Sequence, residues 1–196
     1  KTMLHRIEDY ANVANSVLKN GTFHRWANGA AAAPDSWTES GAGTIARSSN
    51  FYQGVYAASL TNTNSNAYTI YQDVTDFAKY SGLEFSVYAQ AWTTTGDRVR
   101  IQVTDGVNTF NSSYHDGSGM DDEENLRIED QTLAENLTRL RVDLRTETGA
   151  SIEAIWLKVW MAVGGEVITL FDLPSLARIS DVWMEGDKDG VFDVRI

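Results

Sequence analysis

The chain has 196 residues, no cysteine and a formal net charge of −11. The lack of cysteine excludes disulfide bonds and thiolate metal sites, and the negative charge argues against nucleic acid and anionic membranes as partners. No apolar run approaches the roughly 18 residues that a membrane helix needs, and the first residues lack the basic-then-apolar order of a signal peptide. We therefore expect one domain with a sizeable core and no nucleic-acid or membrane partner.

The first predicted element is a short helix over residues 3–18. Apolar side chains recur there at spacings of three and four, which places them on one stripe of a helix: they are Leu4, Ile7, Ala11, Ala14 and Leu18. The stripe covers about two heptads, which is short for a coiled coil. Residues 1–17 are therefore expected to be a helical lead or connector.

Residues 17–40, VLKNGTFHRWANGAAAAPDSWTES, contain three large aromatic side chains but follow neither a helical nor a strand period. Pro34 and Asp35 predict a turn, because proline fixes φ and aspartate bonds to its own backbone. We expect this segment, called the aromatic loop below, to lead the chain into a β-sandwich.

From about residue 43 the hydrophobic period changes to two, the period of half-buried strands. Alternation is clear in LEFSVYAQAW (83–92), RVRIQVTD (98–105), LRVDLRT (140–146) and IWLKVWMA (155–162). Further strands are expected at 44–48, 55–61, 67–74, 107–112 and 166–173. Turns rich in Gly, Asn, Asp and Ser separate these stretches, so the pattern predicts an all-β antiparallel sandwich.

The alternation also assigns inward and outward faces. The inward set is Leu83, Phe85, Val87, Ala89, Ala91, Val99, Ile101, Val103, Leu140, Val142, Leu144, Ile155, Leu157, Val159 and Met161. The outward set includes Arg141, Asp143 and Arg145. The acidic stretch 115–125 is expected to be a solvated loop, and residues 177–196 a C-terminal extension.

Outward-facing aromatic and polar side chains are the candidates for a binding site. Sugar rings stack their apolar C–H faces on aromatic rings, and their hydroxyls need hydrogen-bonding neighbours. The candidate ligand-binding residues are Glu84, Tyr88, Gln90, Trp92, Arg100, Gln102, Trp156 and Trp160. The same residue types suit a protein interface, and a flanking segment could instead cover one of the faces. The sequence leaves these three alternatives open.

Signatures of catalysis are scarce. The chain has no Gly-x-Ser-x-Gly elbow, no phosphate-binding glycine loop and no His-Glu-x-x-His. The chain has three histidines: His5 lies in the predicted helix, and His24 and His115 lie in loops, where we expect solvated side chains. We therefore predict no catalytic residues; the alternative, a jelly-roll glycan hydrolase or lyase, would need acids and a base converging on the Tyr88 and Trp92 face.

The order of these pieces resembles the galactose-binding-like jelly-roll modules, which include the carbohydrate-binding modules of polysaccharide-degrading enzymes. The stretches that carry the resemblance are, in order, NGTFHRW, APDSWT, GVYAASL, YTIYQDV, LEFSVYAQAW, RVRIQVTDG and EVITLFDLPSL. The opening is also similar to modules in structural proteins of tailed phages. The resemblance implies a jelly roll over residues 18–176, with Phe23, Trp26 and Trp37 packed against the open end of the sandwich.

Many members of this group hold a structural calcium ion between an acid after that phenylalanine and an acid in the last strand. Here His24 stands at the first position and Asp172 at the second. Asp172 is thus the candidate metal ligand and calcium the candidate cofactor, but an imidazole replaces an oxygen ligand that calcium prefers.

The resemblance implies a non-catalytic binding or structural module. The lack of cysteine and of a signal peptide, the helical lead and the C-terminal extension favour a phage virion component, either a tail fibre or a capsid decoration. Its partners would be a glycan or neighbouring virion subunits, and it would form a homo-oligomer. The alternative is a glycan-binding module of a secreted polysaccharide-degrading enzyme.

Overall fold

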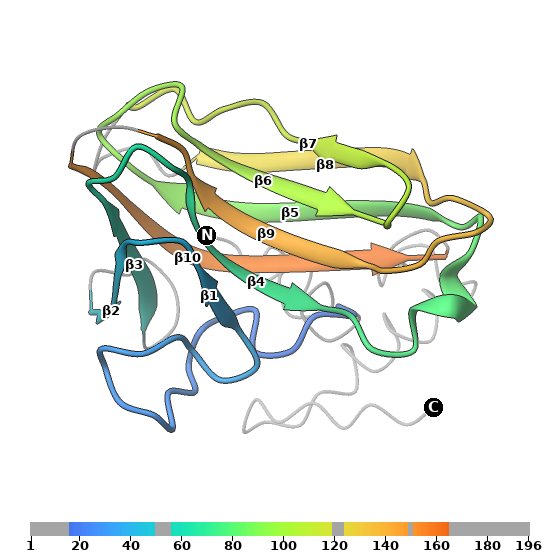
Figure 1. The fold of residues 1–196 in the computed structure, drawn as a ribbon, viewed down its shortest axis with the longest axis horizontal. Coiled ribbons are helices and arrows are strands. Elements are labelled where there is room, and N and C mark those ends of the chain that lie inside the picture. Colours follow the sequence, from blue (N-terminus) through green and yellow to red (C-terminus); the bar gives the residue numbers. More distant parts are fainter. Residues whose placement is uncertain (1–15, 50–55, 119–123, 149–150, 165–196) are drawn as a thin grey trace, which may run out of the picture.

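The computed structural model describes residues 16–49, 56–118, 124–148 and 151–164. These residues form two five-stranded sheets that lie as two layers (Figure 1). Sheet A has the order β1 (Thr38–Ser40), β4 (Tyr68–Asp73), β9 (Arg141–Thr146), β6 (Val99–Thr104) and β7 (Thr109–Asn111). Sheet B has the order β2 (Thr44–Ser48), β3 (Ala57–Asn62), β10 (Ile152–Val163), β5 (Glu84–Trp92) and β8 (Glu124–Thr132). All pairings are antiparallel, so the predicted all-β antiparallel sandwich is confirmed.

The chain crosses repeatedly between the sheets, as in a jelly roll. β3, β5, β8 and β10 belong to sheet B, whereas β4, β6 and β9 belong to sheet A. Strands that follow one another in sequence therefore mostly face each other across the core. The only helix in the described ranges is one short 3₁₀ turn, Phe77–Tyr80, and no helix there is long and apolar enough to cross a membrane.

Inward side chains of both sheets form one core, as the alternation predicts for β5, β6 and β9. Ala89, Ile101 and Leu144 are completely buried, for example. Leu83 is an exception, because it precedes β5 and is 38% exposed rather than inward-facing.

The aromatic loop completes sheet B beside β10. β3 pairs with β10 only as far as Trp156, and beyond this point the loop takes over the edge of β10. Val17 donates its N–H to the carbonyl of Met161 (2.9 Å), and Val159 donates to the carbonyl of Gly21 (2.7 Å). The loop is thus held on the strand edge by backbone hydrogen bonds.

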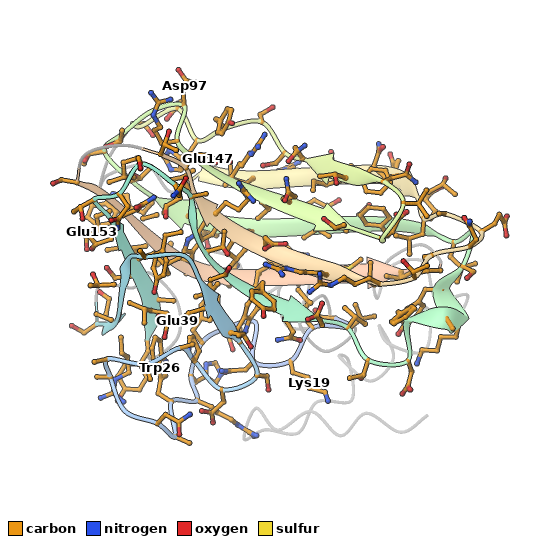
Figure 2. The ribbon with its side chains drawn as sticks, viewed as in Figure 1. Lys19, Trp26, Glu39, Asp97, Glu147 and Glu153 are labelled. Carbon is orange, nitrogen blue, oxygen red and sulfur yellow. The ribbon has the colours of Figure 1, made fainter. Side chains whose placement is uncertain are left out.

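The three large aromatic side chains of this loop are core residues. Phe23, Trp26 and Trp37 are 0%, 8% and 5% exposed. The indole N–H of Trp26 donates to the carbonyl of Phe23 (2.5 Å), and that of Trp37 to the carbonyl of Asn20 (3.3 Å). The expected role of these three side chains in packing is confirmed. Trp26 is labelled in Figure 2.

The side chain of Asn20 closes the aromatic loop. Its amide nitrogen donates to the carbonyls of Arg25 (3.0 Å) and Asp35 (2.9 Å), and its amide oxygen accepts from the N–H of Arg25 (3.2 Å). The side chain of Gln72 on β4 binds the backbone of Lys19: its amide oxygen accepts from the N–H of Lys19 (2.7 Å), and its amide nitrogen donates to the carbonyl of Lys19 (2.8 Å).

Several expectations differ from the structure or lie beyond it. β8 begins inside the stretch expected to be a solvated loop, and β1 was not predicted at all. The expected helix lies outside the described residues except for residues 16–18, which are not helical. The expected strand at 166–173 and the extension at 177–196 lie outside the described residues as well.

Candidate functional site

The candidate ligand-binding residues lie on two opposite surfaces of the sandwich. Those on β5 and β10 that face outward belong to sheet B: Glu84, Tyr88, Gln90, Trp92 and Trp160. Arg100 and Gln102 on β6 belong to the outer face of sheet A. The structure therefore does not bring the eight predicted residues into one site.

The expectation that Trp156 faces outward is wrong. The register between β10 and β5 shifts between Trp156 and Lys158, where β10 carries one extra residue. A single inserted residue reverses the alternation of faces along a strand. Trp156 is consequently fully buried in the main core. Ile155 and Leu157, expected inward, form a separate buried cluster with Ala57, against which Trp92 packs.

The outer face of sheet B carries a ladder of stacked rings and cations. The rings of Tyr88 and Trp160 stack with centroids 5.3 Å apart and an angle of 15°. Arg127 lies over the Tyr88 ring (5.8 Å) and Lys158 over the Trp160 ring (5.3 Å). These neighbours take up the ring faces that a sugar would need for stacking. Gln90 is only 7% exposed on the same sheet.

The outer face of sheet A carries a polar network across four strands. We call it the arginine face, and it consists of Tyr71, Arg100, Gln102, Asn111, Tyr114, Arg141, Asp143, Arg145 and Glu147. Strand register places Tyr71, Asp143, Gln102 and Asn111 in one row across β4, β9, β6 and β7. Arg145 and Arg100 lie opposite each other in the adjacent row.

Hydrogen bonds fix the polar side chains of the arginine face in place. Gln102 donates from Nε2 to Oδ1 of Asn111 (2.8 Å) and accepts at Oε1 from Nη1 of Arg145 (3.2 Å). Arg145 also donates to both carboxylate oxygens of Glu147 (3.1 and 3.2 Å). Arg100 donates from Nε to Oε1 of Glu147 (3.0 Å). Figure 2 labels Glu147, the residue that directly follows β9.

Two arginines of this face also contact tyrosine rings. The guanidinium of Arg141 lies 3.4 Å above the ring of Tyr71 and pairs with the carboxylate of Asp143. The guanidinium of Arg100 lies 4.7 Å from the centre of the Tyr114 ring, and Tyr114 is 36% exposed. A ring beneath the guanidinium restricts the positions that the donor groups of arginine can take.

The two carboxyl groups of the arginine face titrate differently. Burial raises the pKa of Asp143, and this effect exceeds the lowering by Arg141 and the other arginines. Burial would also raise the pKa of Glu147, but hydrogen bonds and charges from Arg145 and Arg100 outweigh it and hold the pKa below its usual range. Glu147 is therefore ionised at neutral pH.

Part of this site is not predicted by the sequence pattern. Tyr71, Asn111, Tyr114 and Glu147 were not candidates, because the pairing of β4, β9, β6 and β7 cannot be read from alternation. The outward positions of Arg141, Asp143 and Arg145 are confirmed. The available signal was that two alternating stretches, RVRIQ and RVDLRTE, both place arginine and amide or acidic side chains on the same face.

The described residues offer little for a metal ion. They contain no group of three or more His, Asp or Glu side chains that could hold one. His24 is exposed, and its ring nitrogens lie 3.1 and 3.3 Å from oxygen atoms of Thr22. Asp172 lies outside the described residues. His115 differs from its expectation, since it is fully buried and its Nδ1 accepts from the N–H of Gly117 (2.9 Å).

Comparison of the sequence with family models found no match, and neither did comparison with curated proteins. Solved structures with a similar fold include two carbohydrate-binding modules. The C-terminal family 22 module of Clostridium thermocellum Xyn10B matches with a TM-score of 0.57 at 17% identity, over 79% of this chain and 99% of that chain. TmCBM61, in complex with β-1,4-galactotriose, matches with a TM-score of 0.54 at 18% identity, over 74% and 97%.

A phage protein has a similar fold as well. The enzymatically active domain of bacteriophage CBA120 tailspike protein 4 matches with a TM-score of 0.56 at 13% identity, over 76% of this chain and 21% of that chain. At these identities the likeness establishes the fold alone. The resemblance to carbohydrate-binding-module-like jelly rolls, with a phage protein among the structures of similar fold, is thereby confirmed.

Proposed function

We propose that this chain is a non-catalytic glycan-binding module and that the arginine face is its binding site. The observation that carries the proposal is the chain of hydrogen bonds from Arg145 through Gln102 to Asn111, which holds these side chains in fixed positions before any ligand arrives. Such fixed donors and acceptors suit the hydroxyl groups of a sugar, because little side-chain entropy is lost on binding.

The arginine face is a better candidate than the outer face of sheet B. On sheet B the rings of Tyr88 and Trp160 are stacked on each other and on Arg127 and Lys158. On sheet A the Tyr114 ring is partly exposed beside hydrogen-bonding groups. A sugar on this face therefore has both an aromatic neighbour and polar partners.

The spacing of carboxyl groups on this face argues against glycoside hydrolysis. Asp143 and Glu147 are four residues apart along an extended chain, which corresponds to about 13 Å between their Cα atoms. Hydrolases hold their two carboxyl groups ~5 to 9.5 Å apart, which this Cα separation allows only if the two side chains turn toward each other. Here each carboxylate is also turned toward arginine, Asp143 toward Arg141, and Glu147 toward Arg145 and Arg100.

Calorimetric titration with neutral and acidic oligosaccharides tests the proposal. Gln102→Ala removes the middle of the hydrogen-bonded chain from Arg145 to Asn111. We therefore expect the affinity for the oligosaccharide to fall by about tenfold, as for loss of one or two hydrogen bonds. Tyr88→Ala on the opposite face is the matched control and should bind like the parent. Equal loss in both variants, or release of reducing sugars by the parent chain, would contradict the proposal.

The biological setting we propose is a phage virion, as part of a tail fibre or a capsid decoration. The similar fold in a phage tailspike supports this setting, and the similar modules of xylanases support the alternative, an accessory module of a secreted polysaccharide-degrading enzyme. Light scattering separates the two: we expect a symmetric homo-oligomer for the full chain in the virion setting. A monomer that binds soluble plant polysaccharide would favour the secreted enzyme.

A further inference from the structure

Arginine side chains outnumber carboxylates at one end of the arginine face. Arg141 is paired with Asp143, and Arg139 with Asp73. At the end of β9, however, Glu147 serves as the single carboxylate partner of two guanidinium groups, those of Arg100 and Arg145. This end of the network therefore carries one positive charge in excess, on a chain whose overall charge is strongly negative.

The excess charge falls on Arg100. Arg145 uses Nε and Nη2 for Glu147 and Nη1 for Gln102, so all three of its nitrogen atoms are engaged. Arg100 uses only Nε, toward Glu147. Within the part of the chain that the structure describes, its Nη1 and Nη2 donate to no acceptor.

The free end of Arg100 is held ready for a ligand. Its Nε is fixed by Glu147 at 3.0 Å, and its guanidinium lies over the ring of Tyr114. The side chain is 21% exposed, so part of it remains accessible to solvent. Two terminal N–H₂ groups in a fixed plane match the two oxygen atoms of a carboxylate, which arginine binds with paired hydrogen bonds.

We propose that the glycan bound by this face carries a carboxylate group, as uronic acids do, and that Arg100 binds this carboxylate through Nη1 and Nη2. The sugar that bears the carboxylate lies beside Tyr114, while Gln102 and Asn111 bind hydroxyl groups of the neighbouring sugar. This inference rests on the proposed function, and it narrows the ligand class from glycans in general to acidic glycans.

The first test uses matched pairs of oligosaccharides. Uronic-acid oligosaccharides of several linkages are titrated alongside their carboxyl-reduced forms, which have the same sugars and linkages but no charge. We expect the acidic forms to bind about tenfold to a hundredfold more tightly, the ratio for a charge-assisted hydrogen-bonded pair. Equal binding of both forms would overturn this inference and leave glycan binding intact, whereas no binding of any acidic or neutral oligosaccharide would overturn both.

The second test uses variants of Arg100. Arg100→Gln should remove the preference for the acidic form, and Arg100→Lys should keep only part of it, because lysine retains the charge but not the planar fork. Arg127→Gln on sheet B makes the same change in net charge and should leave the preference unchanged. If Arg127→Gln reduced it equally, the effect would be long-range attraction and the assignment to Arg100 would fail.

The Arg100 variants are expected to fold. Glu147 keeps two hydrogen bonds from Arg145 after Arg100 is changed, so no buried carboxylate loses all its partners. The melting temperature of each variant serves as the check, and a binding loss at unchanged melting temperature is a loss of recognition. A preference that survives in a folded Arg100→Gln chain would overturn the role of Arg100.

Discussion

The carboxylate of Asp105 at the end of β6 is predicted to be a main support of the arginine face. It is completely buried, and its two oxygens accept four hydrogen bonds. Oδ1 accepts from the N–H groups of Val107 (2.8 Å) and Asn108 (2.5 Å), and Oδ2 accepts from Nδ2 of Asn108 (3.1 Å) and the N–H of Ala134 (2.9 Å). The last bond ties β6 to the segment between β8 and β9, which leads into the arginines of β9.

We expect Asp105→Ala to lower the free energy of unfolding by about 3 kcal/mol. Hydrogen bonds to a charged group contribute ~1.5 to 3 kcal/mol each. Val107 and Asn108 are exposed and can turn their donors to water, so only part of the sum is lost. For a domain of this size, such a loss lowers the melting temperature by roughly 6 to 12 °C.

Asp105→Asn is the sharper variant, because it keeps the shape of the side chain. In asparagine an NH₂ group, which can only donate, replaces one carboxylate oxygen. In either orientation of the amide, this NH₂ group faces two N–H donors and cannot accept their hydrogen bonds. We therefore expect a loss close to that of Asp105→Ala. Thermal unfolding followed by circular dichroism measures both, and an Asn variant as stable as the parent would refute the reasoning.

The difference in stability between the parent and Asp105→Ala should depend on pH in a defined direction. Burial would raise the pKa of Asp105, but the hydrogen bonds from Asn108, Ala134 and Val107 outweigh it, so the pKa lies below its usual range. The part of the stability that depends on ionisation of Asp105 is thus complete above the unfolded pKa of about 3.9, and is lost as the pH falls through the lowered folded value. The free energies of unfolding of the parent and of Asp105→Ala should therefore differ less in strong acid than at pH 7; a difference that does not change with pH would contradict this account.

Five further substitutions, at four positions, test the packing, each by thermal unfolding. Gly21→Ala would place a methyl group 2.1 Å from the carbonyl oxygen of Val159, so we expect the free energy of unfolding to fall by about 2 kcal/mol. Gly29→Ala is the control: the site is open space at φ 92°, and the substitution should cost about 1 kcal/mol. Equal costs for the two substitutions would argue against the close approach of Gly21 to Val159. Asn20→Ala removes three hydrogen bonds that close the aromatic loop and should cost about 2 kcal/mol of stability. An unchanged melting temperature would contradict this and show that solvent replaces the hydrogen bonds fully. Trp156→Phe removes a buried indole N–H that has no hydrogen-bond partner in the described structure. This substitution should therefore cost much less stability than the ~3 to 5 kcal/mol expected for Trp156→Ala. Similar costs for the two substitutions would indicate that the indole N–H does have a hydrogen-bond partner.

Sequence alone determined the fold class and most of the strands. Alternation in residues 84–92 and 98–105 indicated which side chains are inward, because a strand beside an apolar core buries every second residue. The packing role of the aromatic loop came instead from the resemblance to galactose-binding-like jelly rolls, and the buried rings of Phe23, Trp26 and Trp37 agree with it. β8 escaped detection because Leu126 and Ile128 are its only buried apolar side chains among those described.

Two features were decided only by the tertiary structure. The extra residue near Leu157 moves Trp156 from the outer face into the core, and such a bulge arises from the pairing with β5 rather than from the composition of β10. The arginine face likewise depends on strand pairing. Arg100 and Arg145 are far apart in sequence, and they share Glu147 only because β6 and β9 pair in this register. Local periodicity reports which face a side chain occupies, but the neighbours on that face are set by long-range pairing.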